Sequence, residues 1–112
     1  MDEVKDLIER LFRTELPSRA LDTEVAKALG WKEEADGVWV NTQGGRSPRA
    51  PFYTSSLHAI YTFASSLSPR GGASWENGVA SAQIGDGRLI QAKTPEIAMC
   101  IAAILAVHSK GD

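Results

Sequence analysis

The segment from residue 92 to residue 106 constrains the fold more than any other part of the chain. It reads AKTPEIAMCIAAILA, and its Thr94-Pro95-Glu96 is a strong helix-opening signal. Threonine is a preferred N-cap, proline suits the first helical position and an acid suits the first turn. Residues 97–107 are then apolar nearly all round. A helix without a polar face is buried by neighbours on several sides or shared with another subunit, and we expect one of these arrangements here.

Hydrophobic periodicity predicts two helices before it. Apolar residues recur at every third or fourth position over residues 2–14, which indicates an amphipathic helix. Pro17 breaks that pattern. Asp22 is predicted to cap a second helix over residues 23–29, and Gly30 fits the left-handed position that follows a helix end.

The middle of the chain predicts one more helix and several strands. Thr54 or Ser55 is predicted to cap a third helix, which the Pro/Gly stretch 69–72 ends. Residues 37–40 indicate a short strand, and residues 73–93 a β-meander with a tight turn at Gly85-Asp86-Gly87. Residues 41–51, rich in glycine and proline, are the least structured stretch. Three or four helices with a small antiparallel sheet predict an α+β fold packed in layers.

The totals exclude several classes of protein. A chain of 112 residues is one domain. Its net charge of −2 provides no field that recruits nucleic acid or anionic membrane. Cys100 is the only cysteine, so no intrachain disulfide forms and a reducing compartment fits. The N-terminus is charged and helical, unlike a signal peptide, and no apolar run reaches the roughly 20 residues that span a bilayer. We therefore expect a cytoplasmic protein.

Three ordered segments are informative together: LDTEVAKALGW at residues 21–31, PFYTSSL at residues 51–57 and AKTPEIAMCIAA at residues 92–103. In this order and at this spacing they resemble the phage ABA sandwich domain family. The resemblance covers residues 21–106, which leaves residues 1–17 as a helical extension. It implies an α-β-α sandwich in a small protein of a phage or prophage, located in the host cell cytoplasm. It implies no established activity and no catalytic residues.

The catalytic and metal-binding candidates are few. Ser55 and His58 are three apart on a predicted helix and can touch, but a serine near a helix start usually serves as a cap. Cys100 lies mid-helix and reads as a small core residue. Two distant histidines and one cysteine lack the spacing of a metal site, and no phosphate-binding loop is present. We expect no catalytic residue, no metal and no cofactor.

A ligand-binding set is better supported. Arginine forks clamp phosphate, aromatic rings stack bases, and hydroxyl and N–H groups at a helix start hold anions. The alternative is that the tryptophans pack the sheet onto the helices and the arginines keep a loop soluble. The candidate ligand-binding residues are Trp39, Arg46, Arg49, Tyr53, Thr54, Ser55 and Ser56.

These observations lead to three hypotheses of function. The first is a non-catalytic phage accessory protein that binds a small anionic ligand, such as a cyclic nucleotide or an ADP-ribose derivative; its sharpest form is an anti-defence sponge that sequesters a nucleotide immune signal. The second is a protein–protein interaction module that acts on a host or phage protein through the apolar helices. The third is a small hydrolase that uses Ser55 or Ser56 with His58. A homo-oligomer is expected, and neither duplex nucleic acid nor a membrane is an expected partner.

Overall fold

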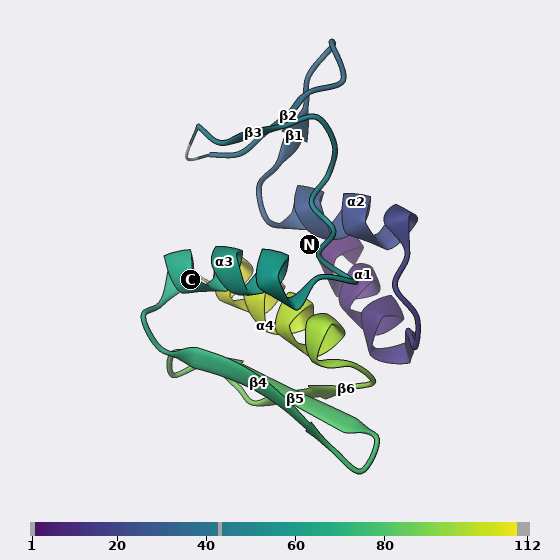
Figure 1. Cartoon of the computed structure of the whole chain (residues 1–112), viewed down its shortest axis with the longest axis vertical. Coiled ribbons are helices and arrows are strands. Elements are labelled where there is room, and N and C mark those ends of the chain that lie inside the picture. The colour runs from purple at the N-terminus through teal and green to yellow at the C-terminus, as the bar shows by residue number, and fades with distance from the viewer. Residues whose placement is uncertain (1, 43, 110–112) are drawn as a thin grey trace.

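The computed structural model describes residues 2–42 and 44–109 (Figure 1). Its fold is α+β, as the sequence predicts. Within the described residues four helices accompany two three-stranded antiparallel sheets, ordered β1-β2-β3 and β4-β5-β6. The elements are α1 (Asp2–Arg13), α2 (Arg19–Ala28), β1 (Lys32–Glu33), β2 (Trp39–Val40), β3 (Arg46–Ser47), α3 (Leu57–Leu67), β4 (Gly71–Glu76), β5 (Val79–Ile84), β6 (Ile90–Ala92) and α4 (Pro95–Ser109).

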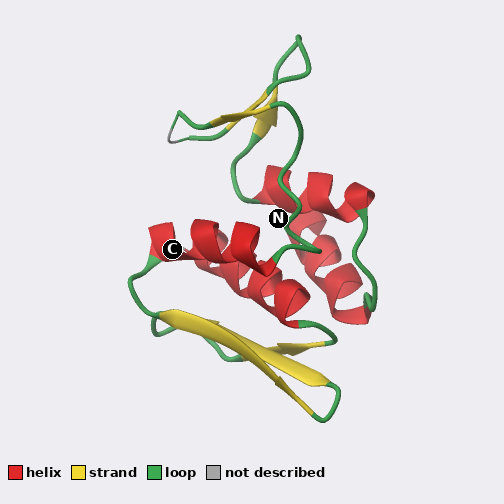
Figure 2. Cartoon of the chain, viewed as in Figure 1, coloured by secondary structure: helices red, strands yellow, loops and turns green. Residues whose placement is uncertain are grey.

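The apolar helix α4 forms the centre of the domain. It packs against α1, α2 and α3 and against all three strands of the β4–β6 sheet. Every residue from Ile97 to Ile104 is buried. Thr94 caps the helix, because its hydroxyl accepts the N–H of Ile97 at 3.1 Å. Figure 2 shows α3 and α4 over one face of the β4–β6 sheet, with α1 and α2 farther from that sheet. Of the two arrangements expected for this helix, the structure shows burial by neighbouring elements on several sides.

The β4–β6 sheet turns an apolar face to α4 and a polar face away from it. Ala80, Ala82 and Ile84 of β5 are buried, while the alternating Ser81 and Gln83 are not. The hairpin between β4 and β5 closes at Asn77-Gly78, where φ is 53° and 79°. Positive φ at both positions is the type I′ geometry that Asn-Gly favours. This turn signal was not among those predicted from the sequence.

The second tight turn lies where it was predicted. The N–H of Gly87 donates to the carbonyl of Ile84 at 3.0 Å, so Gly85 and Asp86 form the corner. The sequence predicts that the strand after this turn covers Arg88–Ala92, whereas in the structure it covers Ile90–Ala92. Leu89, just before it, is 59% exposed.

The start of α2 corrects a prediction. Ser18, not Asp22, is the N-cap, because the Ser18 hydroxyl accepts the N–H of Leu21 at 3.3 Å. The helix therefore begins at Arg19, a turn earlier than expected. Its end matches the prediction: Gly30 has φ 103°. The N–H of Trp31 donates to Ala26 and that of Gly30 to Lys27, the pattern of a glycine-terminated helix.

Two further boundaries differ from the sequence prediction. The N-cap of α3 is Ser56, whose hydroxyl accepts the N–H of Ala59 at 3.1 Å. Neither Thr54 nor Ser55 has that role. Within residues 41–51, expected to be irregular, Arg46–Ser47 forms β3 and pairs with β2. Cross-strand pairing overcomes the local preference of this Gly/Pro-rich stretch.

Candidate functional site

A buried carboxylate ties α2 to the segment that precedes α3. Asp22 is 1% exposed. Its Oδ1 accepts the backbone N–H of Thr54 at 2.7 Å and the Thr54 hydroxyl at 2.6 Å. Its Oδ2 accepts Nη1 of Arg19 at 2.7 Å. A buried carboxylate is tolerated when its oxygens are paired in this way, so Asp22 fixes both the loop and the arginine beside it.

Arg19 contacts both the buried carboxylate of Asp22 and the exposed aromatic ring of Phe52. Its Nη2 donates to the carbonyl of Ala50 at 2.8 Å, and its guanidinium carbon lies 3.9 Å from the centre of the Phe52 ring. The guanidinium of Arg49 lies 5.8 Å from the same ring. Both distances are within the range of a cation–π contact. Phe52 is 41% exposed, so the ring and the two cations form a surface, here called the Arg–Phe surface (Arg19, Arg49 and Phe52).

The positive charge of this surface is only partly balanced. Asp22 pairs with Arg19, and within the described residues Arg49 makes no ion pair. A guanidinium carries five N–H donors, and the Arg19 contacts above use two of them. Both arginines therefore retain donors for an anion, which arginine binds as a planar fork.

Three of the predicted ligand-binding residues lie in the core. Trp39 is 5% exposed, Tyr53 is 3% exposed and Thr54 is 2% exposed. The indole Nε1 of Trp31 donates to the Tyr53 hydroxyl at 3.0 Å, and the Tyr53 ring meets Phe63 edge-on with centroids 6.1 Å apart. Trp39 and Tyr53 therefore pack in the protein interior. The Thr54 hydroxyl donates its hydrogen bond to Asp22.

The other predicted residues are divided between structural and exposed positions. Ser56 is partly buried and caps α3, whereas Ser55 is exposed. Arg46 is exposed on β3 and lies opposite Val40, which in turn lies opposite Lys32. Directly paired residues share a face, so Arg46 and Lys32 flank Val40 on the face of that sheet opposite Trp39. The structure thus brings Arg49, but not Arg46, to Phe52.

The catalytic candidates do not converge. Cys100 is fully buried, and its Sγ donates to the carbonyl of Tyr53 at 3.3 Å. Burial raises the pKa of its thiol well above the ordinary 9.0, so it stays protonated. His58 is exposed on α3, while Nε2 of His108 lies 2.7 Å from the carbonyl of Ala28. Over residues 2–42 and 44–109, no three acidic, histidine or cysteine side chains gather in a metal-binding cluster.

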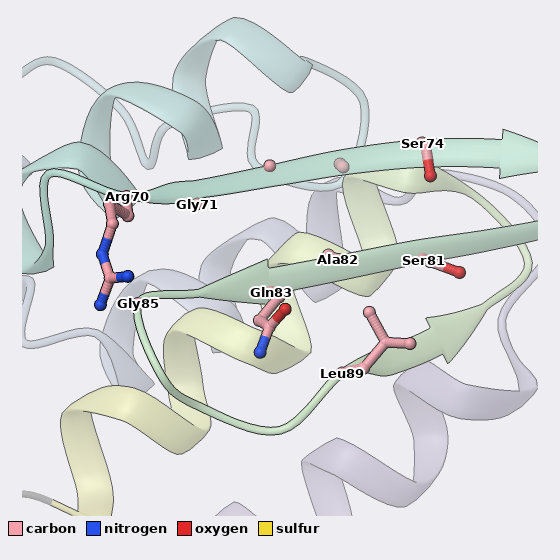
Figure 3. A pocket seen from close by; sticks show the side chains of 10 residues that line it. Arg70, Gly71, Ser74, Ser81, Ala82, Gln83, Gly85 and Leu89 are labelled. Carbon is pink, nitrogen blue, oxygen red and sulfur yellow. The ribbon is translucent and has the colours of Figure 1, made fainter.

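A second candidate lies on the polar face of the β4–β6 sheet. It is an open groove of about 460 Å³. Figure 3 shows the side chains that line it, among them Arg70, Ser74, Ser81, Gln83 and Leu89. Arg70 is the one cation among the residues that line this groove, and Asp86 lies 2.8 Å from it. The Arg–Phe surface has two cations and one carboxylate, so it carries more net positive charge than the groove.

The sequence predictions missed three residues of this site. Arg19 and Phe52 of the Arg–Phe surface, and Asp22 that anchors Arg19, were absent from the candidate ligand-binding residues. The spacing of Arg19 and Asp22, three apart on one helix, is a recognisable ion-pair signal. Nothing local to Phe52 distinguishes it from the neighbouring Tyr53, which is buried.

Comparison of the chain with protein-family models, with curated proteins and with solved structures finds no match. The resemblance to the phage ABA sandwich domain family thus stays a prediction. No helix in the described part of the chain has the length and apolarity that crossing a membrane requires.

Proposed function

We propose that this chain is a non-catalytic binding protein that captures a small anionic ligand at the Arg–Phe surface. The observation that carries the proposal is the convergence of two guanidinium groups, at 3.9 and 5.8 Å, on one exposed ring. The carboxylate of Asp22 pairs with Arg19 alone, so the positive charge of Arg49 is not balanced by an ion pair within the described residues. Arginine forks bind the oxygens of phosphate and carboxylate groups in a bidentate geometry, so a nucleotide or a related phosphorylated ligand fits this surface.

In this proposal each residue has a distinct role. Arg49 binds phosphate oxygens with its guanidinium, and Arg19, held by Asp22 and Ala50, adds its remaining donors. Phe52 replaces Trp39 and Tyr53 as the aromatic contact for a base. Ser55, exposed three residues after Phe52, adds a hydroxyl. If the chain serves a phage, as the resemblance implies, the ligand is a nucleotide immune signal and the protein is an anti-defence sponge.

The two other hypotheses have less support. The interaction module was expected to use the apolar helices. However, α4 is buried by other elements of the same chain, and Leu7 and Leu11 of α1 are buried too. The hydrolase needs a serine within hydrogen-bond reach of His58. The hydroxyl of Ser56 is occupied as a helix cap, and no hydrogen bond joins Ser55 to His58 within the described residues.

The proposal is tested by a thermal-shift screen against cyclic di- and trinucleotides, ADP-ribose derivatives and mononucleotides. A ligand present at 100 times its Kd stabilises the folded state by about 2.7 kcal/mol, which shifts Tm by several degrees. We expect one class to shift the wild type and the Arg88→Ala variant equally. Arg88 is the matched control, because it is exposed on the loop before β6.

The deciding variants are Arg49→Ala and Phe52→Ala. We expect Arg49→Ala to abolish the shift and Phe52→Ala to weaken binding of nucleotides more than binding of pyrophosphate. A screen without any shift would argue against the proposal. So would an Arg49→Ala variant that responds to the same ligand as the wild type does.

A further inference from the structure

Among the residues that the structure describes, strand β4 pairs with β5 alone, which leaves one edge of the β4–β6 sheet open. It pairs with β5 over six residues, from Gly71 to Glu76, without a bulge. Its sequence, GGASWE, contains no lysine and no proline. Proteins usually protect a long edge with such residues or with bulges, because an open edge pairs with other chains. We propose that β4 is a self-association surface, at which it pairs with β4 of a second copy around a twofold axis.

The backbone groups of β4 that face outward can be identified. The N–H of Gly85 donates to the carbonyl of Arg70 at 2.7 Å, so these two residues form a hydrogen-bonded antiparallel pair. Such pairs alternate with non-bonded ones along a ladder. Gly72, Ser74 and Glu76 therefore direct their N–H and C=O groups to β5. Those of Gly71, Ala73 and Trp75 point away from β5, toward the open edge.

One antiparallel register uses all of these groups. With Ala73 opposite Ala73 of the second copy, Gly71 lies opposite the second copy's Trp75, and the three outward-facing residues of each copy are paired. The same register places Arg70 opposite Glu76 of the second copy. Shifting it by two residues in either direction loses this opposite-charge pair. The ion pair of Arg70 with Asp86 joins side chains that are 70% and 90% exposed. It therefore competes only weakly with the pairing of Arg70 and Glu76 between the two copies.

Trp75 supplies the apolar part of the interface. It lies on the face of the sheet toward the helices, because its partner Ala80 is buried, and yet it is 73% exposed. In the proposed register the second copy's Trp75 meets Gly71 on that same face. A cavity of about 200 Å³ lies there. It is lined among others by Tyr61, Ala64, Ser68, Gly71, Ile84 and Met99.

Gly71 adds no side chain to the lining of this cavity. A Cβ at this position would lie 2.9 Å from the carbonyl oxygen of Gln83, so the close approach of the β5 backbone favours glycine here. Tyr61, at 43% exposed, contributes an aromatic wall. Each copy thus offers both an exposed indole and a cavity to receive one. This is the self-complementarity that a twofold interface requires.

The pairing stops at two copies. The other edge strand, β6, has three residues and contacts α1. Short, covered edges resist further pairing, so the two sheets join into one six-stranded sheet without further growth. This inference concerns the sheet edge and does not depend on the ligand proposed for the Arg–Phe surface.

The test is the dimer dissociation constant, measured by sedimentation velocity on the full chain without ligand. A central indole that fills a pocket is a binding hot spot, so Trp75→Ala is expected to weaken the dimer by about 30-fold or more. Val79→Ala is the matched control: Val79 is 45% exposed on the opposite face of the same hairpin, and we expect no change. A wild type that stays monomeric at about 1 mM would overturn the proposal.

Three further variants test the edge and its register. Ala73→Pro removes an N–H that points away from β5, a position where an edge strand tolerates proline, and is expected to give a folded monomer. Arg70→Glu and Glu76→Arg are each expected to weaken self-association, and an equimolar mixture of the two is expected to form a heterodimer. If Ala73→Pro does not fold, the mixture decides. Single charge variants that dimerise like the wild type, or a mixture that stays monomeric, would refute this register.

Discussion

Asp22 and Thr54 lie 32 residues apart, and one carboxylate oxygen of Asp22 accepts both the backbone N–H and the hydroxyl of Thr54. Thr54 also bonds the backbone of Ser18, just before α2. This contact joins the start of α2 to the segment before α3. Arg19 pairs with the same carboxylate, so Asp22 also positions the Arg19 guanidinium over the Phe52 ring.

We expect Asp22→Ala to lower the free energy of unfolding by about 3 kcal/mol. The substitution leaves the buried N–H of Thr54 without an acceptor and removes the partner of Arg19. Urea denaturation followed by circular dichroism measures the loss. The control is Asp86→Ala, which breaks an ion pair whose side chains are 70% and 90% exposed and should cost under about 0.5 kcal/mol. Equal losses in the two variants would contradict this role of Asp22.

Trp31 and Tyr53 are expected to be energetically coupled. Their buried hydrogen bond, 3.0 Å long, leaves either polar group unsatisfied when the other is removed. Trp31→Phe and Tyr53→Phe should each cost about 1–2 kcal/mol. The double variant should cost about 1 kcal/mol less than the sum. A strictly additive double-mutant cycle would mean that this bond contributes nothing to stability.

Sequence signals for helix ends gave correct predictions where the capping contacts join residues that are close in sequence. Thr94-Pro95 opens α4 and Gly30 ends α2, because capping depends on residues only a few positions apart. Asn77-Gly78 is an equally local turn signal, although it is not among the turns predicted from the sequence. The N-cap of α2 was misassigned, since Ser18 and Asp22 are both good caps and the choice depends on Thr54, far away in sequence.

The exposed part of the candidate site was less predictable. Phe52 and Tyr53 are neighbours of similar apolar character, yet Phe52 is 41% exposed and Tyr53 is 3% exposed. Their difference arises from packing against Trp31 and Phe63, which lie on other segments. Arg49 was among the predicted ligand-binding residues, but its position with Arg19 beside the Phe52 ring depends on contacts between distant segments. A single sequence does not specify such neighbours.

Ser56, rather than Ser55, is expected to stabilise α3. Ser56→Ala removes the hydroxyl that accepts the N–H of Ala59 and should cost about 1 kcal/mol. Ser55→Ala is the adjacent control, since Ser55 is exposed and does not cap the helix; its effect should be within about 0.5 kcal/mol. Thermal unfolding of both variants separates these roles. A larger loss from Ser55→Ala would restore the capping assignment made from the sequence.

Stability is expected to fall at alkaline pH through two buried groups. Burial raises the pKa of Cys100 above its ordinary 9.0, and burial raises the pKa of Tyr53 from 10.0 to about 12. A raised pKa in the folded state gives stability that is complete below the unfolded pKa and is lost as the pH rises. The loss therefore begins near pH 9 from Cys100 and steepens above pH 10 as Tyr53 joins it.

Each group should contribute a slope of about 1.4 kcal/mol per pH unit while its unfolded form is ionised and its folded form is not. Urea titrations between about pH 7 and pH 11 measure this slope. Cys100→Ala should abolish the part between pH 9 and pH 10. If that variant keeps the wild-type slope there, another group is responsible.

The most direct test of the proposed function is an NMR titration of the arginine Nε–H signals with inorganic pyrophosphate. If the Arg–Phe surface binds phosphate, the Arg49 and Arg19 signals should shift together and saturate, while the Arg88 signal stays in place. The Phe52 amide signal should follow the two arginines. Saturable shifts at Arg70 or Arg88, with Arg49 and Arg19 unchanged, or no saturable shift at any arginine, would contradict the assignment of this surface as the ligand site.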